Sequence, residues 1–149
     1  MGWLTDLRGQ VVGLDTAPLI YYIEEHPTYL PIVDPFFDAL ANGTVQVVTS
    51  TVTLVEVLVQ PMRRSNSLLV ARYRSLLLTT RGLTVHALSP TIAEEAARLR
   101  ARYTFRTPDA IQLATVLMAG ATAFFTNDVR LAQFPELRVL TVDHLKASS

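Results

Sequence analysis

The chain has 149 residues, 50% of them hydrophobic, which is enough apolar material for one domain, expected to span residues 1–149 with a core at about 11–142. It contains no cysteine, which excludes a disulfide framework and a thiolate metal site, so any metal must be bound by oxygen or histidine. Thirteen basic residues balance thirteen acidic ones, and this neutrality argues against a broad electrostatic footprint on nucleic acid.

The first predicted strand is the short apolar run at 11–14, and it ends at Asp15. Thr16 can cap the helix that follows, which carries Leu19, Ile20 and Ile23, although Asp15 itself is an equally good N-cap. The spacing of apolar residues then predicts one or two helices between Pro27 and Asn42. Three rings in this part of the chain either stack on nucleic-acid bases or belong to the core: Tyr21, Tyr22 and His26.

A second strand is predicted at 45–48, followed by a helix that ends at Gln60, with Pro61 beyond it. Glu56 is unusual in that helix because its neighbours are almost all apolar, and a helix that is hydrophobic all round is buried. A buried carboxylate is costly unless it is paired or binds a metal. The alternative is that Glu56 lies on a single solvated face.

The next predicted elements are a helix at 62–80 and a strand at 83–88. Ser89 and Pro90 then begin a helix that runs to about Arg102.

The stretch RTPDAIQLATVLMAGATAFFTND holds the strongest local signals of the chain. Thr107 is a good N-cap, Pro108 suits the first helical position and Gly120 suits the end of the helix, so a helix is expected at about 108–119. Asp109 lies in the first turn of that helix. A buried strand is expected at 121–125 and Asp128 follows it, whereas the last strand is expected at 137–140, with a frayed tail after Asp143.

This alternation of strands and helices predicts an α/β fold, a three-layer sandwich with a five-stranded parallel sheet and helices on both faces. Right-handed crossovers place the carboxyl ends of all parallel strands at one edge of the sheet. Asp15, Asp109 and Asp128 are therefore expected to meet at that edge, with Glu56 reaching in from the helix after the second strand.

Four convergent carboxylates repel one another unless a cation lies among them. An all-oxygen cluster suits Mg²⁺ or Mn²⁺, which can activate water for hydrolysis of a phosphodiester. Asp15 and Asp109 are expected to be the principal ligands because each is fixed at the start of a helix. Glu56 and Asp128 complete the site, and the expected hydrogen-bonding support comes from Thr16, Thr126 and Asn127.

These acidic residues lie in segments that resemble the motifs of PIN-domain ribonucleases, in particular VapC-type toxins. The matching segments are LDTAPLI with Asp15, TSTVTLVEVL with Glu56, RTPDAIQLATVLMAGA with Asp109 and FFTNDVRL with Asp128. The resemblance covers nearly the whole chain. It implies a Mg²⁺- or Mn²⁺-dependent endoribonuclease, the toxin of a toxin–antitoxin pair, often a homodimer, held inactive by a small antitoxin.

Other classes fit less well or stay open. An aspartyl-phosphate phosphatase needs a second acid two residues after Asp15, where Ala17 stands, and the chain has no phosphate-binding GxxxxGK[ST] loop. A catalytically silent PIN-like binding or assembly module remains the alternative. The surplus of apolar residues, with a mean hydropathy of +0.29, also favours a homodimer.

The sequence also argues against export and membrane insertion. MGWLTDLRGQ at the N-terminus has acid and base and no long apolar run, unlike a signal peptide. No window approaches the roughly 18–20 unbroken apolar residues of a membrane span. We therefore expect a cytoplasmic protein with no membrane partner.

Overall fold

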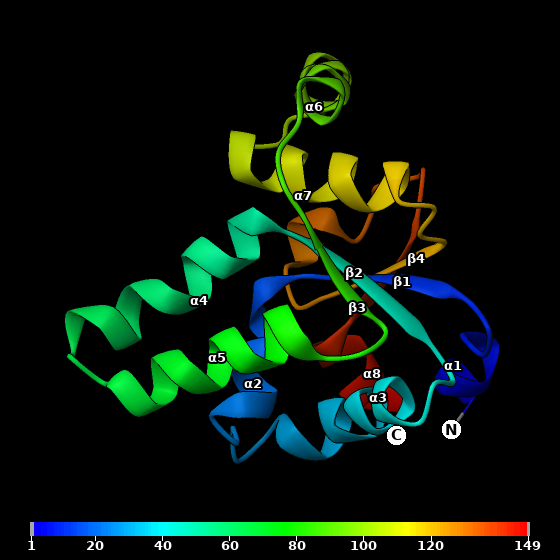
Figure 1. Cartoon of the computed structure of the whole chain (residues 1–149). Coiled ribbons are helices and arrows are strands. Elements are labelled where there is room, and N and C mark those ends of the chain that lie inside the picture. Colours follow the sequence, from blue (N-terminus) through cyan, green and yellow to red (C-terminus); the bar gives the residue numbers. More distant parts are fainter. Residues whose placement is uncertain (1, 149) are drawn as a thin grey trace.

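The computed structural model describes residues 2–148 and contains the predicted five-stranded parallel sheet (Figure 1). The strands lie in the order β3-β2-β1-β4-β5, so β1 is central and every neighbouring pair is parallel. Their carboxyl ends therefore share one edge of the sheet, where open α/β folds bind their ligands. The strands are β1 (Val11–Leu14), β2 (Gln46–Ser50), β3 (Leu83–His86), β4 (Ala123–Thr126) and β5 (Arg138–Thr141).

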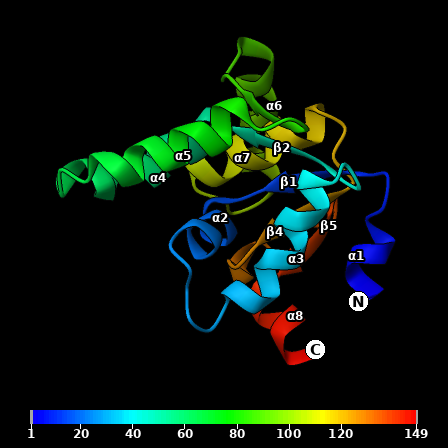
Figure 2. The same cartoon turned by 60° about the horizontal axis from the view of Figure 1, so that its bottom comes forward.

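Helices cover both faces of the sheet, which confirms the predicted three-layer sandwich. In Figure 1, α6 (Pro90–Arg102) and α7 (Thr107–Met118) lie above the sheet, whereas α2 (Thr16–Ile23), α3 (Leu30–Ala41) and α8 (Val142–Ser148) lie below it. Figures 1 and 2 show α4 and α5 side by side, projecting from one side of the molecule. The remaining helical elements are α1 (Gly2–Asp6), α4 (Thr51–Arg63), α5 (Ser67–Thr79) and the 3₁₀ turn η1 (Val129–Leu131).

The two faces of the sheet bury separate clusters because successive residues of a strand point to opposite sides. Phe125 packs with α3 residues such as Phe36 in one cluster, whereas Phe124 packs with Leu99 of α6 and Leu113 of α7 in the other. All five side chains are fully buried.

Gly13 of β1 lets α7 approach the sheet closely. A Cβ at this position would lie 2.8 Å from Phe124 Cδ1 and from Val116 Cβ, closer than real contacts allow. Only glycine fits here. This close contact fixes α7 against β1, which brings the first turn of the helix to the sheet edge where β1 ends.

The predicted boundary between α4 and α5 is wrong. Pro61 lies inside α4, which continues to Arg63, because proline near a helix end removes only one internal hydrogen bond. The stop comes at Ser65, whose φ of 52° is left-handed. Asn66 then caps α5 with Oδ1, which accepts a hydrogen bond from the Leu69 backbone N–H at 3.1 Å.

The tail after Asp143 is not frayed as predicted but forms α8. Val142 and Leu145 are buried against the sheet, and this tertiary packing stabilises a helix too short to persist alone. The predicted strand limits also differ from the observed ones, as is usual at element ends. The predicted ranges 45–48, 83–88, 121–125 and 137–140 correspond to β2, β3, β4 and β5.

Candidate active site

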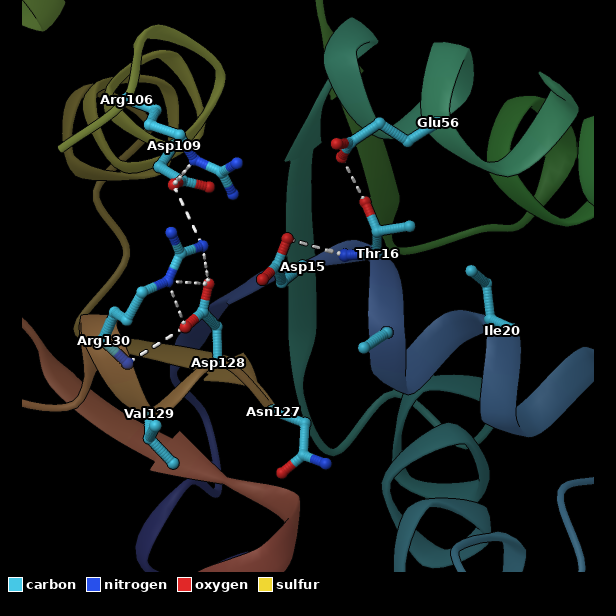
Figure 3. Close-up of a pocket in the computed structure, with 11 residues that line it drawn as sticks. Asp15, Thr16, Ile20, Glu56, Arg106, Asp109, Asn127, Asp128, Val129 and Arg130 are labelled. Carbon is cyan, nitrogen blue, oxygen red and sulfur yellow. Dashed lines mark hydrogen bonds and ion pairs between the residues drawn. The ribbon is translucent and has the colours of Figure 1, made fainter.

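A pocket of about 430 Å³ opens at the carboxyl edge of the sheet, and all four predicted acids line it (Figure 3). Asp15 lies between Glu56 on one side and the pair Asp109 and Asp128 on the other. The four acids expected at this edge therefore line one cavity. The other lining residues are Thr16, Ala17, Ile20, Arg106, Asn127, Val129 and Arg130.

Asp15 is held in one orientation by hydrogen bonds from several elements. Of the two predicted alternatives for the N-cap of α2, Thr16 and Asp15, the structure has Asp15: its Oδ1 accepts a hydrogen bond from the Thr16 backbone N–H at 2.8 Å. Asp15 Oδ2 accepts another from Thr126 Oγ1 at 2.7 Å. Asp15 occupies the N-cap position because its backbone, directly after β1, is still extended, which is the conformation typical of an N-cap.

The pKa of the Asp15 carboxyl is raised above its ordinary value. Burial is the main cause, and the nearby charges of Glu56 and Asp109 add to it, while the hydrogen bonds from Thr126 and Thr16 partly oppose it. An anion at this position is therefore destabilised by its surroundings. A bound cation would relieve both effects.

Gln112 contacts Asp15 and was not identified as a site residue from the sequence. This α7 residue is buried, and its Nε2 donates to Thr53 Oγ1 at 2.5 Å and lies 3.5 Å from Asp15 Oδ1. Its Oε1 has no partner among the described residues. The available signal was a lone amide among the apolar positions of the helix.

Glu56 lines the pocket, but the expectation that it is buried is wrong. The residue is exposed rather than buried, because α4 projects from the body and leaves its outer side uncovered, with Val55 62% exposed. Glu56 is instead held by Thr16, whose Oγ1 donates to Glu56 Oε1 at 2.6 Å. The Thr16 hydroxyl therefore orients the Glu56 carboxylate and does not cap α2.

Asp109 lies in the first turn of α7 as predicted, where the helix dipole favours its charge. The predicted N-cap is wrong: Thr107 is already helical, and Arg106 occupies the cap position without a side-chain cap bond. The Thr107 hydroxyl instead accepts a hydrogen bond from Arg100 Nη1 at 3.0 Å. Arg106 Nε lies 3.7 Å from Asp109 Oδ2.

Arg130 pairs with Asp128 and was also missed. Its Nε lies 3.0 Å from Asp128 Oδ1 and its Nη2 lies 2.5 Å from Oδ2, while Nη2 is also 3.6 Å from Asp109 Oδ2 (Figure 3). The hydrogen bonds from Arg130 lower the pKa of the Asp128 carboxyl. Arg130 therefore supplies positive charge to two of the four acids.

Thr126 and Asn127 order the loop that carries Asp128. Thr126 Oγ1 accepts a hydrogen bond from the Asp128 backbone N–H at 3.0 Å. Asn127 Oδ1 accepts one from the Asp143 N–H at 2.9 Å, and its Nδ2 donates to the Tyr21 hydroxyl at 3.1 Å. Asn127 thus ties the pocket to α2 and α8.

The three aromatic rings considered for base stacking already have aromatic neighbours. Tyr21 packs against His26 and Tyr29, with ring centroids 5.1 and 4.5 Å apart. Tyr22 stacks on Phe37 at 4.1 Å. These contacts favour the core interpretation of the three rings.

Comparison with known proteins identifies the family. The profile of the PIN domain matches residues 12–137, which is most of the chain. The chain belongs to the PIN-domain family. Comparison with curated protein sequences gave no match.

Solved structures share the fold of this PIN domain at low sequence identity. VapBC2 from Rickettsia felis, bound to a DNA fragment from its promoter, matches with a TM-score of 0.67 and 16% identity over 88% of this chain and 98% of the other. A toxin–antitoxin complex from Klebsiella pneumoniae matches with a TM-score of 0.65 and 23% identity, over 88% of this chain and 97% of the other. VapC20 from Mycobacterium tuberculosis, a toxin that cleaves the sarcin–ricin loop, matches with a TM-score of 0.66 and 18% identity, over 85% of this chain and 98% of the other.

The side chains that line the pocket of this PIN domain suit a hard divalent cation in chemistry. The four acids offer only oxygen, which Mg²⁺ and Mn²⁺ prefer. Within residues 2–148, however, no three carboxylate or imidazole groups are close enough together to bind one ion. Asp128 and Asp109 face Arg130 instead, so binding of a metal by all four acids requires Arg130 to move.

No helix within residues 2–148 combines the length and the hydropathy that a bilayer span requires. α4 and α5 do carry large exposed apolar side chains, among them Val55, Met62, Leu68 and Leu78.

Proposed function

We propose that this PIN domain is a Mg²⁺- or Mn²⁺-dependent endoribonuclease and the toxin of a toxin–antitoxin pair. The observation that carries the proposal is the set of four carboxylates around one pocket, among them Asp15 with a raised pKa. Perturbed acids in a cleft are typical of catalytic sites. The fold shared with VapC20, described as cleaving the sarcin–ricin loop, supports the choice of RNA as the substrate.

Asp15 and Asp109 would be the principal metal ligands, with Glu56 and Asp128 completing the set. When bound, the cation would activate water and neutralise charge on the phosphodiester. The residues around the ligands have separate tasks in this proposal. Thr126 and Gln112 orient Asp15, and Thr16 orients Glu56.

The test is RNA cleavage by the full chain, purified free of any bound partner. We expect cleavage of single-stranded RNA in Mg²⁺ or Mn²⁺ and none in EDTA. Absence of cleavage with both metals, together with normal binding of a partner protein, would favour the catalytically silent binding module instead.

We also propose a small antitoxin as a partner and a homodimer as the assembly. The solved structures of VapBC2 and of the Klebsiella pneumoniae pair are toxin–antitoxin complexes. The exposed apolar residues of α4 and α5 support a contact surface for a second protein chain, since large exposed apolar patches mark interaction sites. Sedimentation that shows only monomers at tens of micromolar protein would contradict the dimer.

The contact of Arg130 with Asp128 and Asp109 leads to a prediction about metal affinity. Arg130→Gln should tighten Mg²⁺ or Mn²⁺ binding about two- to fivefold, because the guanidinium competes with the cation for these carboxylates and is itself 54% exposed. Isothermal titration calorimetry measures the change. Arg81→Gln, which removes an exposed charge at the amino end of β3, should leave the affinity unchanged. Equal or weaker metal binding by Arg130→Gln would show that Arg130 does not compete.

A further inference from the structure

A second hollow, of about 380 Å³, lies next to the carboxylate pocket and shares Arg130 with it. It is formed where the end of α6 and the α6–α7 loop meet the segment after β4. Its walls are rich in arginine and aromatic residues, which are Arg102, Arg130, Tyr103, Phe105 and Phe134. None of the described residues that line it is acidic.

The aromatic side of the hollow is a preformed unit. Tyr103, Phe105 and Phe134 pack on one another with ring centroids 5.3–5.6 Å apart. Phe134 is buried, whereas Tyr103 and Phe105 are only partly covered. The Tyr103 hydroxyl donates to Glu136 Oε2 at 3.0 Å, which fixes the ring at the surface.

The cationic side of the hollow is formed by Arg102 and Arg130. Within residues 2–148, Arg102 forms no ion pair, and its guanidinium carbon lies 5.8 Å from the centroid of the Tyr103 ring. Glu136, which accepts the hydrogen bond from Tyr103, is paired with Arg98 at 2.8 Å and attracts Arg102 only as a more distant charge. Arg102 is therefore available for an external anion beside an aromatic surface.

We propose that this hollow binds a nucleotide of single-stranded RNA next to the cleaved bond, with phosphate on Arg102 and Arg130 and a base against Tyr103 and Phe105. Proteins bind single strands by combining arginine contacts to phosphate with aromatic rings that stack on bases. The hollow shares Arg130 with the carboxylate pocket, so one strand that passes this residue can contact both. The neutral net charge of the chain makes such a local contact necessary.

This inference rests on the proposed ribonuclease function, and the test separates the two. Binding of a short, fluorescein-labelled, unstructured RNA is measured by fluorescence anisotropy in EDTA, where metal-dependent cleavage is silent. Cleavage by the same proteins is measured separately in Mg²⁺ or Mn²⁺. Thermal unfolding of each variant confirms that it is folded.

Arg102→Gln should weaken RNA binding and lower the slope of log Kd against log salt concentration by about 0.7, as expected for one lost phosphate contact on a single strand. Tyr103→Leu should weaken binding roughly fivefold or more, because a stacked base is lost. Tyr103→Phe keeps the ring and should restore most of that loss. Arg81→Gln, at the opposite end of the sheet, is the matched charge control.

The outcomes are distinct. If wild type cleaves RNA but Arg102→Gln and Tyr103→Leu bind like Arg81→Gln, the nucleotide site is wrong and the enzyme stands. If the variants lose RNA binding but wild type cleaves nothing, the nucleotide site stands and the enzyme is wrong. If Arg102→Gln loses only an acidic partner protein and keeps RNA, the hollow is a protein interface and the inference is overturned.

Discussion

Asp15→Asn should lower RNA cleavage at least about 100-fold in Mg²⁺ or Mn²⁺ while leaving the protein folded. Asp15 is partly buried and held in one orientation by hydrogen bonds from Thr126 and from the start of α2. Loss of even an outer-shell partner of a metal ligand costs about 10- to 100-fold, so loss of the ligand charge itself should cost more. Asparagine is as good an N-cap as aspartate, so α2 should persist.

The same substitution should raise the melting temperature in metal-free buffer at neutral pH. Because the pKa of Asp15 is raised in the folded state, its contribution to stability is fully present below the ordinary aspartate pKa and is lost as pH rises through the folded value. Asparagine does not ionise, so the stability of Asp15→Asn does not fall in this way as the pH rises. Its advantage over wild type should therefore be largest at neutral pH and should vanish at low pH.

Asp6→Asn is the matched control, because Asp6 is exposed and lies away from the pocket, 3.4 Å from Arg138. It should cleave RNA like wild type. Cleavage by Asp15→Asn at the wild-type rate would show that the site is assigned wrongly. A melting temperature below that of wild type at neutral pH would show that the lost hydrogen bonds outweigh the relief of charge.

Phe125→Ala should lower the free energy of unfolding by about 3–5 kcal/mol, because it leaves a large cavity in the core. Phe125 is fully buried on β4 and packs against Phe36 and Trp3, with ring centroids 4.7 and 5.5 Å away. Its carbonyl also accepts a hydrogen bond from the Asp15 N–H at 2.9 Å, so the strand that positions Asp15 loses its packing.

Denaturant titration followed by circular dichroism measures this loss. Leu68→Ala is the control: it also removes a large apolar side chain, but one that is 73% exposed on α5, so it should change stability by about 0.5 kcal/mol or less. Similar losses in the two variants would contradict the assignment of Phe125 to the core.

The sequence by itself determined the sheet and the approximate position of three acids. Short apolar runs, proline and glycine are local signals, and they placed each strand near its observed limits. Gly120, with a φ of 85°, follows α7 as expected. Parallel strands must share their carboxyl edge, so the sequence alone predicts that Asp15, Asp109 and Asp128 meet at one edge of the sheet.

Glu56 is a different case: it lines the pocket, but the burial expected from the apolar sequence of its helix is absent. A helix with apolar residues on nearly all sides was expected to be buried, but α4 projects from the body and leaves Val55 exposed. Whether an apolar helix face is covered depends on where the helix lies relative to the sheet. Periodicity alone does not contain that information.

Only the tertiary structure decided which groups touch the acids. Gln112 and Asp15 are 97 residues apart, and the distance between them depends on the close approach of α7 to Gly13. The contact of Arg130 with Asp109 likewise depends on how η1 lies beside α7, whereas its contact with Asp128 is local, between residues two positions apart. Local patterns specify which segments are helix or strand, whereas contacts between side chains on different elements arise only when those elements pack together.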